Sequence, residues 1–269
     1  MKDVNPALRA VPPPESGSSS AYQRGDSRGD APVLEKMLGR AKPDEHLVSL
    51  LTPATFEAEQ YRTLGLMLEQ RRQTGLLQVV AMTSPTMGDG KTLTAINLAG
   101  AVSQSPSARV LLMDVDFRKP SIAAQLGLRD NIVGLRDAAL NAGLRLKDVV
   151  RRHPAWNLSI ATAGRAQGLP HEIIKSARFA ELLNEARRDY EWIFLDTPPL
   201  MLAPDCLILG RNVDGFLMVV YANKTSRQEV AEALNSLGPS KLLGLVYNGD
   251  DRLLSSYNYG AYYMTPESG

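Results

Sequence analysis

The sequence predicts an α/β fold: a doubly wound, mostly parallel sheet flanked by helices. Short apolar segments alternate with helical segments from residue 77 onward, as in repeated strand–helix–strand units. Five apolar segments are nearly continuous runs: VVAMTS, VLLMD, WIFLD, FLMVVY and LLGLVYN. Strands without polar alternation are buried on both faces, which is typical of a parallel sheet covered by helices.

The expected elements alternate regularly along one α/β domain that spans about residues 45–250. We expect strands over 77–83, 109–114, 158–163, 192–196, 214–222 and 242–248. We expect helices over 55–73, 91–103, 134–141, 146–152, 170–190, 204–210 and 226–237. Proline at the first position supports the start of the helix at Pro170.

Both ends of the chain differ from this domain. Residues 1–44 are rich in proline, serine, glycine and mixed charge, so we interpret them as a disordered arm. Residues 251–269 form a tail, interpreted as flexible, that contains Tyr257, Tyr259, Tyr262 and Tyr263 spaced by Asn, Gly and Ala.

Composition excludes several classes of protein. The net charge of +1 argues against a nucleic-acid binder that relies on bulk basic charge. No apolar run approaches the roughly 18 residues of a transmembrane helix, and the N-terminus does not resemble a signal peptide. Cys206 is the only cysteine, so a disulfide within the chain is excluded and a cytoplasmic location fits.

A glycine loop between the first strand and its helix predicts a phosphate-binding site. The segment reads Thr86-Met87-Gly88-Asp89-Gly90-Lys91-Thr92, then Leu93 in the helix. Glycines let backbone N–H groups approach an anion, and the helix N-terminus favours negative charge. Lys91 can reach the β- and γ-phosphates and Thr92 can ligate Mg²⁺, although Pro85 replaces the usual first glycine.

Aspartates follow two further strands and complete the predicted site. Asp114 and Asp116 follow LLM, and Asp196 follows IFL. Ligands of doubly wound sheets bind at the carboxyl ends of strands, so these side chains should lie near Lys91 and Thr92. Carboxylates there can hold Mg²⁺ and accept a proton from an attacking hydroxyl, which is what phosphoryl transfer needs.

Three segments, TSPTMGDGKTLTAINLA, LLMDVDFRKP and WIFLDTPP, resemble the Walker A, Walker A′ and Walker B motifs of the bacterial tyrosine kinases. The resemblance spans about residues 57–248 and implies a P-loop NTPase fold of the SIMIBI type, related to MinD and ParA. It implies that residues 87–93 bind ATP and that Thr92, Asp114 and Asp196 hold Mg²⁺.

The same resemblance implies roles for the remaining candidate residues. Lys91 with Asp114 or Asp116 would be catalytic, and Asn248 would help to seat the adenine. The four tail tyrosines, Tyr257, Tyr259, Tyr262 and Tyr263, would be the phosphoacceptors of an ATP-dependent autokinase acting in trans.

For biology, the resemblance implies control of exopolysaccharide polymerisation and export. It implies self-association, a transmembrane chain-length-determinant partner that activates the kinase and recruits it to the inner membrane, and a cognate tyrosine phosphatase. The family's assembly motif, E-x-x-R-x-x-R, is matched by Glu59 and Arg62 but has Gly65 at its third arginine position. Assembly then either does not use this helix or uses Arg71 or Arg72.

Two other functions use the same pocket. A MinD/ParA-like ATPase would hydrolyse ATP against water, but that group carries a second lysine where this chain has Thr86. A nucleotide-gated scaffold of the export machinery would bind ATP with phosphorylation incidental. Phosphorylation of tyrosine by the purified chain would favour the kinase over both the ATPase and the scaffold.

Overall fold

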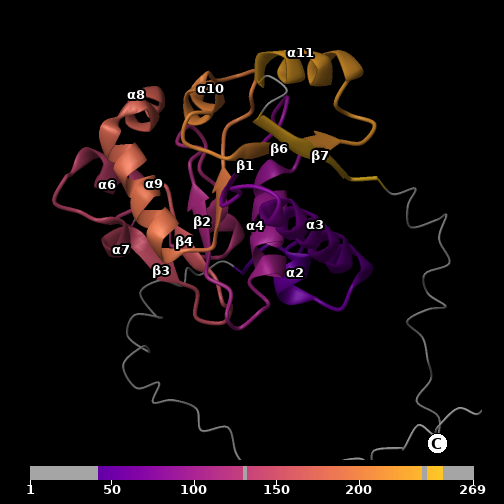
Figure 1. Cartoon of the computed structure of the whole chain (residues 1–269), viewed down its shortest axis with the longest axis horizontal. Helices are drawn as coiled ribbons and strands as arrows, with labels where there is room; N and C mark the ends of the chain where they lie inside the picture. The colour runs from indigo at the N-terminus through magenta and orange to yellow at the C-terminus, as the bar shows by residue number, and fades with distance from the viewer. Residues whose placement is uncertain (1–41, 130–131, 238–240, 251–269) are drawn as a thin grey trace, which may run out of the picture.

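A seven-stranded sheet organises the molecule, with strand order β3-β4-β2-β5-β1-β6-β7 (Figure 1). The computed structural model describes residues 42–129, 132–237 and 241–250. The strands are β1 (Val79–Thr83), β2 (Val110–Asp114), β3 (Val150–Arg152), β4 (Ser159–Ala161), β5 (Trp192–Asp196), β6 (Gly215–Tyr221) and β7 (Leu242–Asn248). All neighbouring pairs are parallel except β3 with β4. The predicted α/β fold is confirmed.

The central strands β1, β2 and β5 are buried at every residue. Side chains alternate along β1: Val79 and Ala81 belong to one core cluster, whereas Val80 and Met82 belong to the other. The sheet therefore buries both faces, which is why these segments read as continuous apolar runs rather than as alternating ones.

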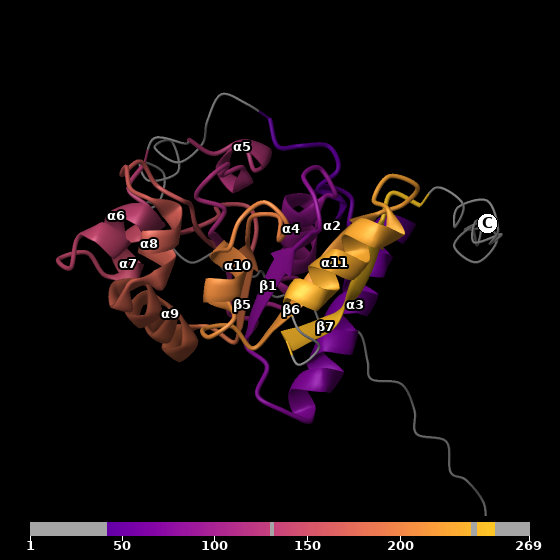
Figure 2. The ribbon, with the colours of Figure 1, turned by 90° about the horizontal axis from the view of Figure 1, so that it is seen from above.

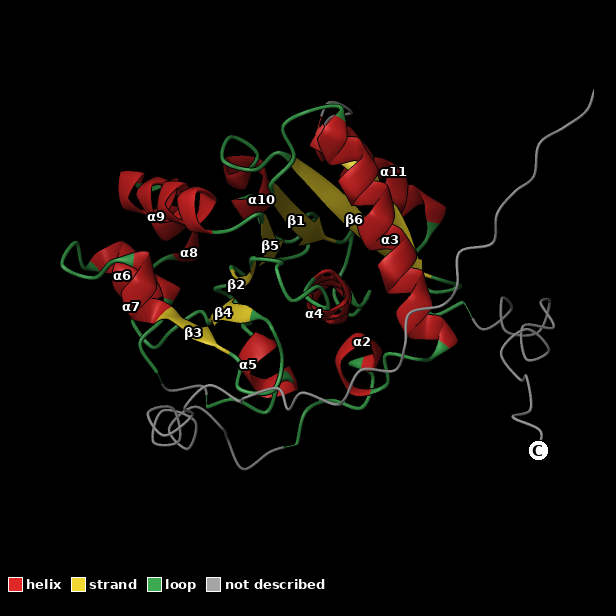
Figure 3. Ribbon diagram, turned by 60° about the horizontal axis from the view of Figure 1, so that its bottom comes forward, coloured by secondary structure: helices red, strands yellow, loops and turns green. Residues whose placement is uncertain are grey.

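Helices cover the two faces in two groups. One face holds α2 (Val48–Leu51), α3 (Phe56–Gln73), α4 (Lys91–Val102) and α5 (Ile122–Gln125). The other holds α6 (Leu135–Leu140), α7 (Leu146–Val149), α8 (Pro170–Lys175), α9 (Ala177–Asp189), α10 (Asp205–Leu209) and α11 (Arg227–Leu237). Figure 3 shows α2, α4 and α5 below the sheet and α9, α10 and α11 above it, and Figure 2 shows α6 to α9 gathered at the end of the sheet far from β7.

Two predicted helices were wrong in extent. The helix expected over 146–152 ends at Val149, and residues 150–152 form an edge strand antiparallel to β4. The helix expected over 170–190 breaks at Ser176, whose backbone is extended and whose hydroxyl oxygen accepts a hydrogen bond from Phe179 N. A serine that caps a new helix competes with continuation of the preceding one.

The helix that carries the partial assembly motif is α3. Glu59 and Arg62 form an ion pair on it, with Arg62 Nε donating to Glu59 Oε2 at 2.7 Å. Gly65 is buried against α4, and a Cβ at this position would lie 3.1 Å from Val102 Cγ2. A side chain at this position would need Val102 to shift by a few tenths of an ångström, so the glycine allows the close packing of α3 on α4.

Candidate active site

The glycine loop forms the turn between β1 and α4. Gly88 has φ of 78° and Gly90 has φ of 90°, a left-handed conformation that residues with a Cβ rarely adopt. Gly90 is the N-cap of α4, so the loop delivers Lys91 and Thr92 to the first turn of a helix that is buried over most of its length. The sharp glycine turn expected between this strand and this helix is therefore present.

Lys91 lies among the predicted aspartates. Its Nζ donates to Asp116 Oδ2 at 2.9 Å and lies 3.6 Å from Asp196 Oδ1. Burial alone would lower the pKa of this lysine, but the charges of Asp196 and Asp116 outweigh burial and raise the pKa. Lys91 therefore stays charged and is the cation of the cluster.

Thr92 joins the other two aspartates. Its hydroxyl donates to Asp196 Oδ2 at 2.6 Å and accepts from Ser121 Oγ at 3.2 Å. Backbone N–H groups of Ser121 and Ile122 both donate to Asp114 Oδ2 at 3.0 Å. Asp114 and Asp196 are paired in register on the adjacent strands β2 and β5, so the sheet itself sets the spacing of the two carboxyls.

The three carboxyls are buried against a single lysine. Burial, then the neighbouring charge of Asp196, raises the pKa of Asp114 well above its usual range. Burial raises the pKa of Asp196 to about 6, against the opposing effects of Lys91 and Thr92. Burial and the neighbouring like charges therefore make Asp114 and Asp196 harder to ionise than a free aspartate.

A divalent cation fits this arrangement. Asp114 Oδ1 and Asp196 Oδ1 are buried and have no hydrogen-bond partner among the described residues. With Lys91 charged, the ionised forms of Asp114, Asp116 and Asp196 leave an excess of negative charge that Mg²⁺ would neutralise. No group of three or more His, Cys, Asp or Glu residues within the described ranges could hold a metal by itself. A bound ion would therefore share its coordination with Thr92 and with phosphate oxygens.

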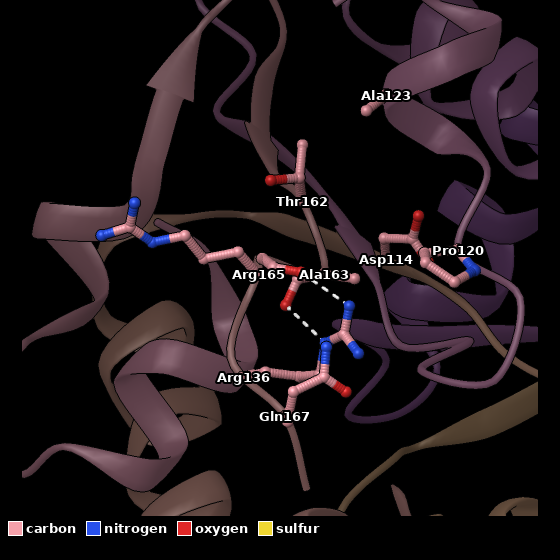
Figure 4. Close-up of a pocket in the computed structure, with 9 residues that line it drawn as sticks. Asp114, Pro120, Ala123, Arg136, Thr162, Ala163, Arg165 and Gln167 are labelled. Carbon is pink, nitrogen blue, oxygen red and sulfur yellow. Dashed lines mark hydrogen bonds between the residues drawn. The ribbon is translucent and has the colours of Figure 1, made fainter. Parts of the chain in front are cut away.

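Two cavities lie at this edge of the sheet. One, of about 350 Å³, is lined by Met87, Gly88, residues 90–93, Asp116 and other residues. The second, of about 290 Å³, lies beside Asp114 and includes Arg136, Thr162 and Gln167 in its lining (Figure 4). Thr162 Oγ1, like Asp114 Oδ1, is buried without a partner among the described residues. Asp116 therefore borders the first cavity and Asp114 the second.

The Arg136 side chain donates hydrogen bonds to backbone carbonyls in the wall of the second cavity. Its Nη2 donates to Gly164 O at 2.6 Å and its Nε to Ala163 O at 3.4 Å (Figure 4). Arg165 extends away from Asp114 in the same view. The polar side chains that line the cavity are thus an acid, a hydroxyl, an amide and two guanidiniums, of which that of Arg136 is held by backbone carbonyls. This set can both donate to and accept from a bound hydroxyl.

Two residues predicted to bind the nucleotide, Asp89 and Asn248, also make side-chain contacts within the chain. Asp89 is fully buried and turns its carboxylate to Thr86 N at 3.1 Å and Thr225 Oγ1 at 2.8 Å, so its side chain braces the loop. Asn248 Nδ2 donates to Asp89 O at 3.1 Å, so its amide also contacts the loop. The predicted phosphoacceptors, Tyr257, Tyr259, Tyr262 and Tyr263, lie outside the described residues.

Sequence reasoning missed three residues of the site: Ser121, Lys224 and Thr225. Ser121 bridges Thr92 and Asp114 as described above. Lys224 Nζ donates to Met87 O at 3.2 Å and to Gly88 O at 3.0 Å. The signal was available, because Asn223-Lys224-Thr225 follows the carboxyl end of β6, where ligands of such sheets bind.

Arg118 and Cys206 support the site from outside. Arg118 Nε donates to the buried carboxylate of Asp205 at 2.9 Å rather than to Asp116. Cys206 is fully buried, its thiol contacts Pro198 O at 3.2 Å, and burial raises its pKa to about 11. Both contacts tie α10 to the segments that follow β2 and β5.

Comparison with known proteins identifies the family. A family model described as an AAA domain matches residues 77–209. The "Tyrosine-protein kinase YwqD" of Bacillus subtilis (strain 168) is 32% identical over 238 residues, which cover 88% of this chain and 98% of that protein. The chain belongs to the bacterial tyrosine-protein kinase family.

Two further relatives agree. The "Putative tyrosine-protein kinase EpsB" of Ralstonia nicotianae is 31% identical over 233 residues. These residues cover 86% of this chain but only 30% of that longer protein. The solved VpsO kinase domain is 30% identical, has a TM-score of 0.66, and is matched over 77% of this kinase and 96% of that domain. No helix in the described part of the kinase is long and apolar enough to cross a bilayer.

Proposed function

We propose that this kinase transfers the γ-phosphoryl group of Mg²⁺-ATP to the tyrosines of its own C-terminal tail, in trans between copies. The observation that carries the proposal is the Lys91–Asp116 pair at the wall of the loop cavity, 2.9 Å apart. Lys91 would move from this carboxylate to the β- and γ-phosphates, which frees Asp116 Oδ2 to accept a proton.

The reaction needs a base close to the acceptor. A phenol has an ordinary pKa near 10, so its hydroxyl attacks poorly without one. Asp116 would take the phenol proton as the new oxygen–phosphorus bond forms and the bond to the β-phosphate oxygen breaks, with ADP as leaving group. Mg²⁺ held by Thr92 and Asp196, with Asp114 beside them, would neutralise charge on the phosphates.

The second cavity is where we place the acceptor side chain. Pro120 lines this cavity, and the neighbouring Lys119 and Ser121 line the loop cavity, so the two cavities meet at this segment. An acceptor hydroxyl held by the unpartnered groups of Asp114 and Thr162 would have to reach past Pro120 to Asp116. Gln167 is exposed and lines this cavity, so Gln167→Trp would obstruct it without disturbing the core. We expect a drop in tail phosphorylation of about tenfold or more with unchanged ADP affinity; unchanged phosphorylation places the acceptor elsewhere.

The first experiment incubates the purified chain with Mg²⁺-ATP and reads intact mass and phosphotyrosine sites. Phosphate should appear on Tyr257, Tyr259, Tyr262 or Tyr263, and Lys91→Met should abolish it. ATP hydrolysis without tyrosine modification would instead support the MinD/ParA-like ATPase or the scaffold. A negative result is checked by adding the cytoplasmic segment of the membrane partner, because activation can depend on it.

Transfer in trans is tested by mixing two variants that are each silent alone. One carries Lys91→Met with its tail intact, and the other is wild type with residues 251–269 removed. Phosphate on the Lys91→Met chain supports the proposal, because its own site cannot supply it. The matched control mixes tail-free Lys91→Met with the full Lys91→Met chain. An unmodified Lys91→Met chain in this mixture, together with phosphorylation of the full wild-type chain alone at a rate per molecule independent of concentration, would contradict transfer in trans.

The cellular setting follows the family. We propose a cytoplasmic kinase of exopolysaccharide polymerisation and export, recruited to the inner membrane by a transmembrane chain-length-determinant partner and reversed by a tyrosine phosphatase. Deletion of the kinase should change polymer length or export, and Lys91→Met should reproduce that phenotype.

A further inference from the structure

The outer side of the glycine loop is held by a second segment of the chain, the turn between β6 and α11 together with the end of β7. Three consecutive loop carbonyls are bound from this side. Lys224 Nζ binds Met87 O and Gly88 O at 3.2 and 3.0 Å, and Asn248 Nδ2 binds Asp89 O at 3.1 Å.

Peptide geometry gives these contacts a consequence for the phosphate side. In a planar trans peptide, the C=O of one residue and the N–H of the next point in opposite directions. Carbonyls of residues 87, 88 and 89 that point outward therefore turn the N–H groups of Gly88, Asp89 and Gly90 away from Lys224 and Asn248. Residues 88 and 90 line the loop cavity, whereas Lys224 and Asn248 are not among its lining residues.

The clamp is itself fixed in position. Asn223 has φ of 59°, a left-handed conformation that asparagine tolerates better than most residues, and this turn places Lys224. Lys224 Nζ lies 5.6 Å from the centre of the Tyr221 ring. Thr225 Oγ1 accepts from Tyr221 N at 3.1 Å and donates to Asp89 Oδ1 at 2.8 Å.

The fit between clamp and loop is close. A Cβ at Gly88 would lie 2.8 Å from Lys224 Nζ, and a Cβ at Gly90 would lie 2.0 Å from Asn248 Nδ2. The two loop glycines thus serve the approach of the clamp as well as the left-handed turn. Lys224 and Asn248, although distant in sequence, therefore lie directly against the glycine loop.

We propose that Lys224 and Asn248 are positioning residues that orient the loop N–H groups toward the nucleotide phosphates. The proposal rests on the nucleotide site proposed above. It differs from the earlier interpretation of Asn248, because an adenine contact would leave phosphate binding unchanged when Asn248 is altered.

The test measures binding of ADP and of inorganic tripolyphosphate to the full chain, with Lys224→Met and Asn248→Ala. Both variants should bind both ligands about tenfold more weakly. Lys224→Met loses the hydrogen bonds from a charged donor, and Asn248→Ala loses the hydrogen bond from the side-chain amide to Asp89 O. Lys175→Met removes an exposed lysine on α8 and should leave both affinities within about twofold. Lys224→Arg, which keeps a charged donor, should restore part of the loss.

A second measurement separates positioning from simple charge attraction. Amide hydrogen exchange at residues 88–90, without nucleotide, should rise in Lys224→Met and Asn248→Ala and stay unchanged in Lys175→Met. A loss of affinity that disappears at high salt with unchanged exchange would overturn the proposal, as would unchanged tripolyphosphate affinity. If the wild-type chain binds no ADP, the proposed function fails. If the wild-type chain binds ADP and the variants bind both ligands equally well, only the positioning role fails.

Discussion

The two ends of the sheet treat their carboxylates in opposite ways: Asp214 at the amino end is partly buried, whereas Asp114 and Asp196 at the carboxyl end are fully buried. At the amino end, Asp214 accepts hydrogen bonds from Gln78 N, Val79 N and Arg187, with Arg187 Nη2 at 2.6 Å from its Oδ1. At the carboxyl end, Asp114 and Asp196 each keep one buried oxygen without a hydrogen bond among the described residues. The first end is satisfied and holds the fold, whereas the second carries excess charge that a ligand would relieve.

The acid groups show the same contrast in their pKa values. Burial works to raise the pKa of Asp214, but the bonds from Arg187, Val79 and Gln78 lower it overall. The pKa of Asp196 is raised to about 6, because the effect of burial is larger than the opposing effects of the Lys91 charge and the Thr92 hydrogen bond. One carboxyl therefore stabilises the folded chain and the other destabilises it at neutral pH.

The largest expected effect is on the reaction. Asp116→Asn should lower tail phosphorylation at saturating Mg²⁺-ATP by roughly 100-fold, because the proton acceptor is lost. ADP affinity should stay equal or improve, since Lys91 loses its nearest competitor for the phosphates. Rates by quantitative phosphotyrosine mass spectrometry and affinities by calorimetry test this. A variant that phosphorylates normally would move the base to Asp114.

Next in size is the amino-end anchor. Asp214→Asn should lower the free energy of unfolding by roughly 2 to 3 kcal/mol, because Arg187 loses its charged partner. Urea unfolding measures it, with Asp189→Asn as control, since Asp189 is an exposed acid near the end of α9. ADP affinity of the folded fraction should not change; a loss of ADP affinity would show that the two ends are coupled.

The opposite sign is expected at the site. Asp196→Asn should raise the free energy of unfolding by about 1 to 3 kcal/mol at pH 7 while abolishing phosphorylation, because a buried charge with a raised pKa is removed. Urea unfolding without ligand checks it. Destabilisation of similar size would mean that the pair with Lys91 outweighs burial.

The smallest effects are the pH windows of these two acids. Asp214 has a lowered folded pKa, so its contribution is present above 3.8 and is lost as pH falls through the folded value. Asp196 has a raised folded pKa, so its contribution is present below 3.8 and is lost as pH rises through about 6. The difference in the free energy of unfolding between wild type and Asp196→Asn should therefore grow as pH rises from 3.8 to about 6. The corresponding difference for Asp214→Asn should shrink only as pH falls below 3.8. Unfolding series across pH 3 to 8 compare them.

The sequence was most informative where chemistry coincides with strand ends. Asp114 and Asp196 could be placed together because the carboxyl ends of parallel strands meet at one edge. The position of Lys224 after β6 placed it at the ligand-binding edge, but its bonds to the carbonyls of Met87 and Gly88 depend on the distance between two turns far apart in the chain, which the sequence does not give. The break at Ser176 and the strand at 150–152 were missed because local periodicity continues through both, and only the tertiary context selects a cap or an edge pairing.

The burial of Cys206 makes the molecule convenient for site-specific labelling. It is the only cysteine of the chain, and its thiol is fully buried with a pKa raised to about 11, so it reacts slowly with thiol reagents. A cysteine introduced at an exposed position such as Gln167→Cys would be the reactive thiol of an otherwise native protein. A fluorophore there would report directly on when the cavity beside Asp114 fills and empties.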